Sequence, residues 1–132
     1  MTYKVQNIET LSPIVLAYIG DAVYDLYVRT KLISQISGSI DKLHKAATNY
    51  VKSSAQAQSF HMVESILTEQ ELTVFKRGRN AKSAVPKNAD MGEYRVATGL
   101  EALIGYIYLK QDTTRLDEVM NFILGDDINE GS

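Results

Sequence analysis

The sequence contains no cysteine and no long hydrophobic run among its 132 residues. Without cysteine it has no disulfide bridges, no thiol nucleophile and no cysteine-ligated zinc site. No apolar run approaches the roughly 18 residues that a membrane-spanning helix needs. Glu9 and Asp21 also interrupt the stretch in which an export signal would have its apolar core. We therefore expect a cytoplasmic protein without a membrane partner.

The sequence does contain enough apolar material for one compact core. It is 45% hydrophobic and 23% charged, a composition that excludes disordered, collagen-like and low-complexity chains. At this length we expect one domain over residues 1–132, with a flexible acidic tail at about residues 126–132.

Nearly all local signals are helical, and no segment alternates apolar and polar residues over the length of a strand. Ser12 followed by Pro13 is typical of a helix start, Asp41 is a second candidate cap, and Thr68 with Glu71 forms a capping-box pattern. The predicted fold class is therefore all-α, with about six helices at residues 13–32, 41–52, 55–67, 68–79, 92–110 and 114–124 and a loop at 80–90.

The helices expected at 13–32 and 92–110 are apolar nearly all round, yet each carries an acid, Asp21 or Glu101, on a face with small and apolar neighbours. Gly20 and Gly105 would let the two helices approach closely. If these faces pack together, the two carboxylates meet, and their repulsion is relieved by a hard divalent cation between them. Such a cation would keep most of its water ligands, because only two carboxylates hold it.

A structural role is the alternative for both acids, since an unpaired buried carboxylate is costly and Arg29 or Arg95 could neutralise it. Asp25 and Glu64 are further acids that could join the pair. A chain of this size also has few elements with which to surround two apolar helices. We therefore expect a two-fold dimer.

The formal net charge of −2 argues against nucleic-acid binding, but it conceals a basic segment. Five basic residues and no acid lie between positions 76 and 87, so the rest of the chain carries −7. These side chains either contact phosphates or form a solvated basic helix end. The candidate RNA-binding residues are Lys76, Arg77, Arg79, Asn80, Lys82 and Lys87.

Two local sequences resemble the catalytic domain of the ribonuclease III family. LAYIGDAV at residues 16–23 is similar to the signature helix of that family, and LEALIG at residues 100–105 is similar to its second catalytic segment. KRGRNAKS at 76–83 and PKN at 86–88 resemble the short bacterial branch, Mini-III ribonuclease. The resemblance extends over nearly the whole chain.

This resemblance implies an all-helical homodimer that cuts double-stranded RNA with Mg²⁺, or with Mn²⁺ in its place. It implies a role in maturing 23S ribosomal RNA, with precursor RNA and ribosomal proteins as partners. Asp21 and Glu101 then correspond to catalytic metal ligands. Ala17 and Thr98 stand where longer family members have further acids, so a four-carboxylate site does not carry over. Thr98 offers instead a hydroxyl for a metal-bound water.

Longer members of the family add a separate domain that binds double-stranded RNA, and the predicted helices leave no residues for one. RNA contacts are then expected from the basic segment. Two other functions remain open at this point. The missing acids favour an inactive dimer that binds structured RNA, and the helical pattern alone is compatible with a protein-interaction domain.

Overall fold

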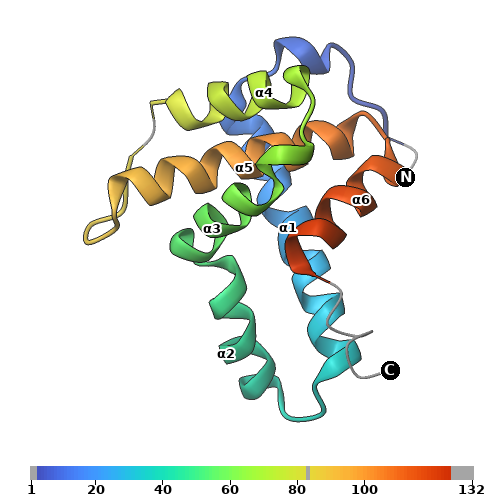
Figure 1. Cartoon of the computed structure of the whole chain (residues 1–132), viewed down its shortest axis with the longest axis vertical. Helices are drawn as coiled ribbons and strands as arrows, with labels where there is room; N and C mark the ends of the chain where they lie inside the picture. Colours follow the sequence, from blue (N-terminus) through green and yellow to red (C-terminus); the bar gives the residue numbers. More distant parts are fainter. Residues whose placement is uncertain (1–2, 83, 126–132) are drawn as a thin grey trace.

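The computed structural model describes residues 3–82 and 84–125. Within these residues the chain forms six α-helices, two short 3-10 turns and no strand, which confirms the all-α prediction (Figure 1). The elements are η1 (Ile8–Thr10), α1 (Pro13–Gln35), α2 (Ile40–Val51), α3 (Ser53–Val63), η2 (Glu64–Ile66), α4 (Glu69–Asn80), α5 (Met91–Leu109) and α6 (Thr113–Leu124). The acidic tail predicted at about 126–132 lies outside the described residues.

Two of the predicted helix starts are formed as expected. The Ser12 hydroxyl accepts a hydrogen bond from the backbone N–H of Ile14 at 3.2 Å, directly before Pro13. At α4 the capping box is complete, because Thr68 and Glu71 each accept a hydrogen bond from the backbone N–H of the other. These contacts satisfy N–H groups that have no partner within a helix.

The prediction that Asp41 caps the second helix was wrong. Ser39 is the cap, and its hydroxyl accepts a hydrogen bond from the N–H of Lys42 at 3.3 Å. Asp41 lies in the first turn, where its negative charge still faces the positive end of the helix dipole. Helix α1 also continues to Gln35, three residues beyond its predicted end.

Helix α5 runs through the middle of the bundle and contacts α1, α3, α4 and α6 (Figure 1). Residues 97–100 and 102–107 are all buried, so this apolar helix is enclosed as expected. Helix α1 is enclosed on one side only. Its outer side exposes Val15, Tyr18 and Leu26, with 82% of Tyr18 accessible.

Helices α1 and α5 approach each other through two glycines. A Cβ atom placed on Gly20 would lie 1.7 Å from the backbone oxygen of Glu101, and one on Gly105 would lie 2.0 Å from that of Leu16. No other residue type can occupy these positions at this spacing, because neither neighbour is a side chain that can move aside. The expected close approach of the two helices is confirmed.

Helix α6 is attached to the start of α4 by one buried ion pair. The Arg115 guanidinium donates to both carboxylate oxygens of Glu71, at 2.8 and 2.7 Å, and also to the backbone oxygen of Ile66 at 2.7 Å. Burial raises the pKa of Glu71, but Arg115 and the hydrogen bonds from Thr68 together outweigh this effect and hold the pKa below its usual value. Glu71 therefore holds α6 and caps α4 at the same time.

None of the described helices is both long enough and apolar enough to cross a membrane.

The glycine contact predicts a large loss of stability for Gly20→Ala. The added methyl group overlaps the backbone of Glu101, so α1 and α5 must separate, and the free energy of unfolding should fall by at least about 2 kcal/mol. Urea denaturation measures this change. Gly92→Ala is the matched control, because its Cβ would lie 3.3 Å from a side-chain oxygen of Asp90 rather than against backbone, and it should change stability by less than about 1 kcal/mol. Equal stability of Gly20→Ala and the wild type would contradict the close approach.

Candidate active site

The structure brings Asp21 of α1 and Glu101 of α5 together. Gly20, the neighbour of Asp21, packs directly against the backbone of Glu101, so the two acids lie at the point where the helices are closest. The two side chains are near enough for Asp21 to contribute to the raised pKa of Glu101. The close contact of the two helices at Gly20 and Glu101 therefore supports the expectation that the two side chains lie together.

The two acids differ in exposure. We expected both to lie among apolar side chains, but only Glu101 is half-buried, and Asp21 is exposed. The reason is the position of Asp21 at the margin of the α1–α5 contact, where Ala17 and Tyr24 point inward and Asp21 faces outward. One carboxylate of the pair thus faces solvent while the other lies at the edge of the core.

The environment of Glu101 favours its protonated form. Burial is the largest cause, and the hydrogen bond and negative charge of Asp21 add to it, so that the pKa of Glu101 rises from 4.5 to about 8. The side-chain N–H of Gln56 acts in the opposite direction, because it donates to Glu101 Oε2 at 3.4 Å. A raised pKa of this kind is typical of a partly buried carboxyl group that shares a site with a second one.

The donor set suits a hard divalent cation with few protein ligands. The described part of the chain has no group of three or more histidines or acids that could hold a metal. Neither Asp25 nor Glu64 therefore completes a three-acid site, and Asp25 instead forms an ion pair with Arg29 at 2.9 Å. Two carboxylate oxygens match the ligand preference of Mg²⁺, which keeps several waters when it is bound by one or two carboxylates.

Thr98 lies one turn before Glu101 on α5 and is buried. Its hydroxyl donates a hydrogen bond to the backbone oxygen of Tyr94 at 3.0 Å, so its proton is used within the helix. The oxygen keeps lone pairs that can accept from a water molecule. The role of Thr98 as a contact for a metal-bound water stays a prediction.

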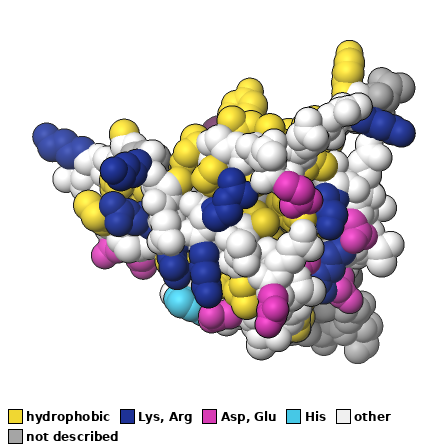
Figure 2. Space-filling model, turned by 90° about the horizontal axis from the view of Figure 1, so that it is seen from above, with side chains coloured by type: hydrophobic (Ala, Val, Ile, Leu, Met, Phe, Trp, Pro, Cys, Tyr) yellow, Lys and Arg dark blue, Asp and Glu magenta, His cyan; other side chains and the backbone are white. Residues whose placement is uncertain are grey.

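The basic segment lies at the end of α4 and in the loop that follows it. Figure 2 shows the molecule from above, and Lys and Arg side chains gather in the left part of that view. Figure 1 places the loop on the same side. The exposed members of the segment are Lys76, Arg77, Asn80, Lys82 and Lys87, whereas Arg79 is half-buried.

Two arginines of the basic segment also have partners within the protein. Arg77 donates to the backbone oxygen of Leu11 at 3.1 Å, which attaches the segment before α1 to α4. Arg79 donates to the side chain of Asn80 at 3.2 Å and lies over the ring of Phe75. Among the described residues, Lys76, Lys82 and Lys87 make no such contact, and they are therefore the better candidates for phosphate binding.

Gln56 is the residue near the pair that the sequence did not indicate. It lies in the polar stretch SSAQAQS at residues 53–59, where Gln56 and Gln58 look alike. The structure separates them, since Gln56 is buried beside Glu101 and Gln58 is exposed. Only knowledge of which face α3 turns toward α5 could have distinguished the two.

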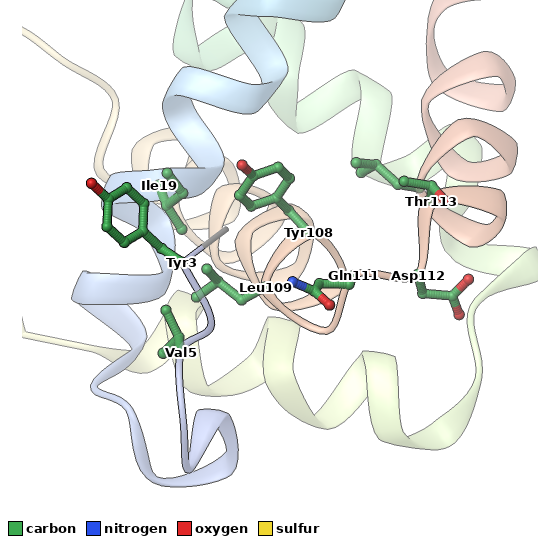
Figure 3. A pocket seen from close by; sticks show the side chains of 9 residues that line it. Tyr3, Val5, Ile19, Tyr108, Leu109, Gln111, Asp112 and Thr113 are labelled. Atoms are coloured by element: carbon green, nitrogen blue, oxygen red, sulfur yellow. The ribbon is translucent and has the colours of Figure 1, made fainter. Parts of the chain in front are cut away.

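An apolar hollow lies at a different place, between the segment before α1, helix α1 itself and the junction of α5 and α6 (Figure 3). Tyr3, Ile19 and Tyr108 line it, and none of the predicted site residues does. The candidate site is therefore the acid pair and not this hollow.

Comparison with known proteins shows the family to which this chain belongs. Residues 14–112 match the Ribonuclease III domain family, a range that includes both acids and the basic segment. A Mini-ribonuclease 3 from Clostridium tetani is 45% identical over 121 residues, covering 90% of this chain and 80% of that protein. One from a Thermoanaerobacter species is 46% identical over 116 residues, covering 87% of this chain and 82% of that protein.

The fold is similar to that of a solved protein as well. An X-ray crystal structure of a protein from Fusobacterium nucleatum superposes with a TM-score of 0.80 at 28% identity, covering 91% of this chain and 97% of that one. The resemblance seen in the local sequences is confirmed over most of the chain. This chain belongs to the ribonuclease III family of endoribonucleases.

Proposed function

We propose that this protein is a Mg²⁺-dependent endoribonuclease that cuts double-stranded RNA and matures precursor 23S ribosomal RNA in the cytoplasm. The observation that carries the proposal is the meeting of Asp21 and Glu101 at the closest point of α1 and α5. Mn²⁺ can take the place of Mg²⁺, since oxygen ligands suit both ions. The names of the similar Mini-ribonuclease 3 proteins support a ribonuclease function.

The chemistry assigned to the chain's own residues follows from their exposure. Asp21 is at the surface, where a phosphate of the RNA backbone can approach, and Glu101 lies behind it at the edge of the core. Both side chains must be ionised to hold a cation, so Glu101 has to release its proton. When bound, Mg²⁺ would stabilise the charge that develops on the phosphate and make a water molecule more acidic.

We further propose that RNA is held by the catalytic domain itself, a single domain over residues 1–132, through Lys76, Lys82 and Lys87. Lysines that contact phosphates recognise the shape of the RNA rather than its sequence. This suits A-form RNA, whose backbone and minor groove are accessible while its bases are not. The weakly acidic total charge is compatible with this role, because the five basic residues are concentrated in one segment. Ribosomal proteins bound to the precursor are proposed as further partners.

A homodimer is proposed on the basis of the outer face of α1. Val15, Tyr18 and Leu26 leave 48%, 82% and 64% of their surfaces accessible on one helix, close to the acid pair. A second copy that covers this face would bury these side chains and place two acid pairs in one assembly. Each pair would then act on one strand of the duplex.

The acid pair predicts that Asp21→Asn and Glu101→Gln each lower the cleavage rate of long duplex RNA in Mg²⁺ by at least about 100-fold. Both variants should still bind the duplex, since neither residue belongs to the basic segment. Asp25→Asn is the matched control on the same helix, and it should cleave at close to the wild-type rate. EDTA should abolish cleavage by the wild type.

Other outcomes of this experiment would favour other functions. Duplex binding by the wild type without cleavage would indicate an inactive RNA-binding dimer, and the absence of both would indicate a protein-interaction domain. Persistent cleavage by Asp21→Asn would contradict the assignment of the pair. Precursor 23S ribosomal RNA that is cut no better than an unrelated duplex would contradict the proposed substrate.

The raised pKa of Glu101 predicts a pH dependence of stability in EDTA. The folded pKa of about 8 exceeds the ordinary value of 4.5, so the stabilisation is complete below about pH 4.5 and is lost as the pH rises through about 8. The free energy of unfolding of the wild type should therefore fall relative to that of Glu101→Gln over this range, by the order of a few kcal/mol. Parallel stability curves for the two proteins would contradict the raised pKa, and excess Mg²⁺ should reduce the wild-type loss.

The basic segment predicts a change in salt dependence. Replacing Lys76, Lys82 and Lys87 with alanine removes three phosphate contacts, so the slope of log Kd against log salt should decrease by roughly 2 to 3. The matched control replaces Lys42, Lys45 and Lys52, which are exposed on or next to α2, and its slope should stay near that of the wild type. Sedimentation should give a dimer for both variants, which excludes loss of assembly as the cause.

A further inference from the structure

Gln56 is a buried amide in the wall of the active site. It lies on α3 with 2% of its surface accessible, and its Nε2 donates a hydrogen bond to Glu101 Oε2 at 3.4 Å. This distance is at the long end for an N–H···O bond, and such contacts commonly shorten when a site binds its ligand. A buried amide is costly unless it has a partner, and Glu101 is the partner that α3 provides for Nε2.

The other polar groups of this wall direct their protons elsewhere. The Tyr24 hydroxyl donates to the Ser59 hydroxyl at 3.1 Å, and the Ser59 hydroxyl donates to the backbone oxygen of Ala55 at 3.0 Å. Tyr24 and Ser59 therefore connect α1 to α3 without donating to Glu101. Among the described residues, Gln56 is the neutral donor whose N–H points at this carboxyl group.

We propose that Gln56 is a positioning residue, which holds the Glu101 carboxylate toward Asp21 and thereby raises the affinity of the pair for a divalent cation. This inference rests on the proposed function. Gln56 is not a metal ligand in this proposal, and it acts through Glu101.

Two physical effects support this role. The Gln56 amide N–H occupies one lone pair of Glu101 Oε2, so a neutral donor holds the carboxyl group and its other lone pairs stay available to a cation. The amide is also fixed within the core, since α3 packs against α5, and it therefore restricts the rotation of the Glu101 side chain. Partners that orient a metal ligand in this way commonly alter metal affinity by about 10- to 100-fold.

The test compares Gln56→Met with Gln58→Met. Methionine has nearly the same length and flexibility as glutamine but no N–H donor, and Gln58 is an exposed glutamine on the same helix. Calorimetric titration of the RNA-free proteins with Mn²⁺ should give a Kd about 10-fold higher for Gln56→Met and an unchanged Kd for Gln58→Met.

Cleavage assays give a second readout that a merely structural defect would not produce. Gln56→Met should cleave more slowly than the wild type at limiting Mn²⁺ and recover most of the rate at saturating Mn²⁺, with KM for duplex RNA unchanged. An unchanged Mn²⁺ Kd in folded Gln56→Met would overturn the proposal, as would a rate that saturating Mn²⁺ does not restore.

A measurement on the wild type keeps the proposal testable if Gln56→Met does not fold. The side-chain NH₂ resonances of Gln56 should shift on titration with Mg²⁺, with the same midpoint as backbone signals near Glu101, and those of Gln58 should not move. Unchanged Gln56 resonances at saturating Mg²⁺ would overturn the inference. Failure of the proposed function is a separate result, because the wild type itself would then neither bind Mn²⁺ nor cleave duplex RNA.

Discussion

The contact between α1 and α5 is the constraint on which the rest of this structure depends. At Gly20 and Gly105 the two backbones approach so closely that a single methyl group would overlap a carbonyl oxygen. This spacing determines where Asp21 and Glu101 lie, since each acid stands beside the contact on its own helix. Helices α3, α4 and α6 enclose α5 together with α1, so the bundle serves to keep two carboxylates in one place.

Burying Glu101 next to a second acid has an electrostatic cost, because burial first and the charge of Asp21 second raise its pKa. The fold tolerates this cost because Asp21 remains exposed and Gln56 donates to Glu101 from α3. A core made only of apolar side chains would avoid the strain, but it would offer no binding site for a cation. The pair is thus a place where local stability and function require different residues.

The helices and the acid pair could be predicted from the sequence, because caps and small residues act locally. Ser12 and Thr68 indicated helix starts, and Gly20 beside Asp21 indicated a close contact. The exposure of Asp21 could not be predicted, since it depends on the angle at which α1 crosses α5. Gln56 was missed for a related reason: its burial depends on how α3 turns, and nothing in its own segment differs between Gln56 and Gln58.

The ion pair of Arg115 with Glu71 connects α6 to the start of α4. The basic segment begins at the other end of α4. Glu71 serves as a helix cap and as an ion-pair partner, so a change at either position would leave an uncompensated charge or an open helix end in the interior. Glu71 and Arg115 therefore act as one structural unit, although 44 positions separate them in the sequence.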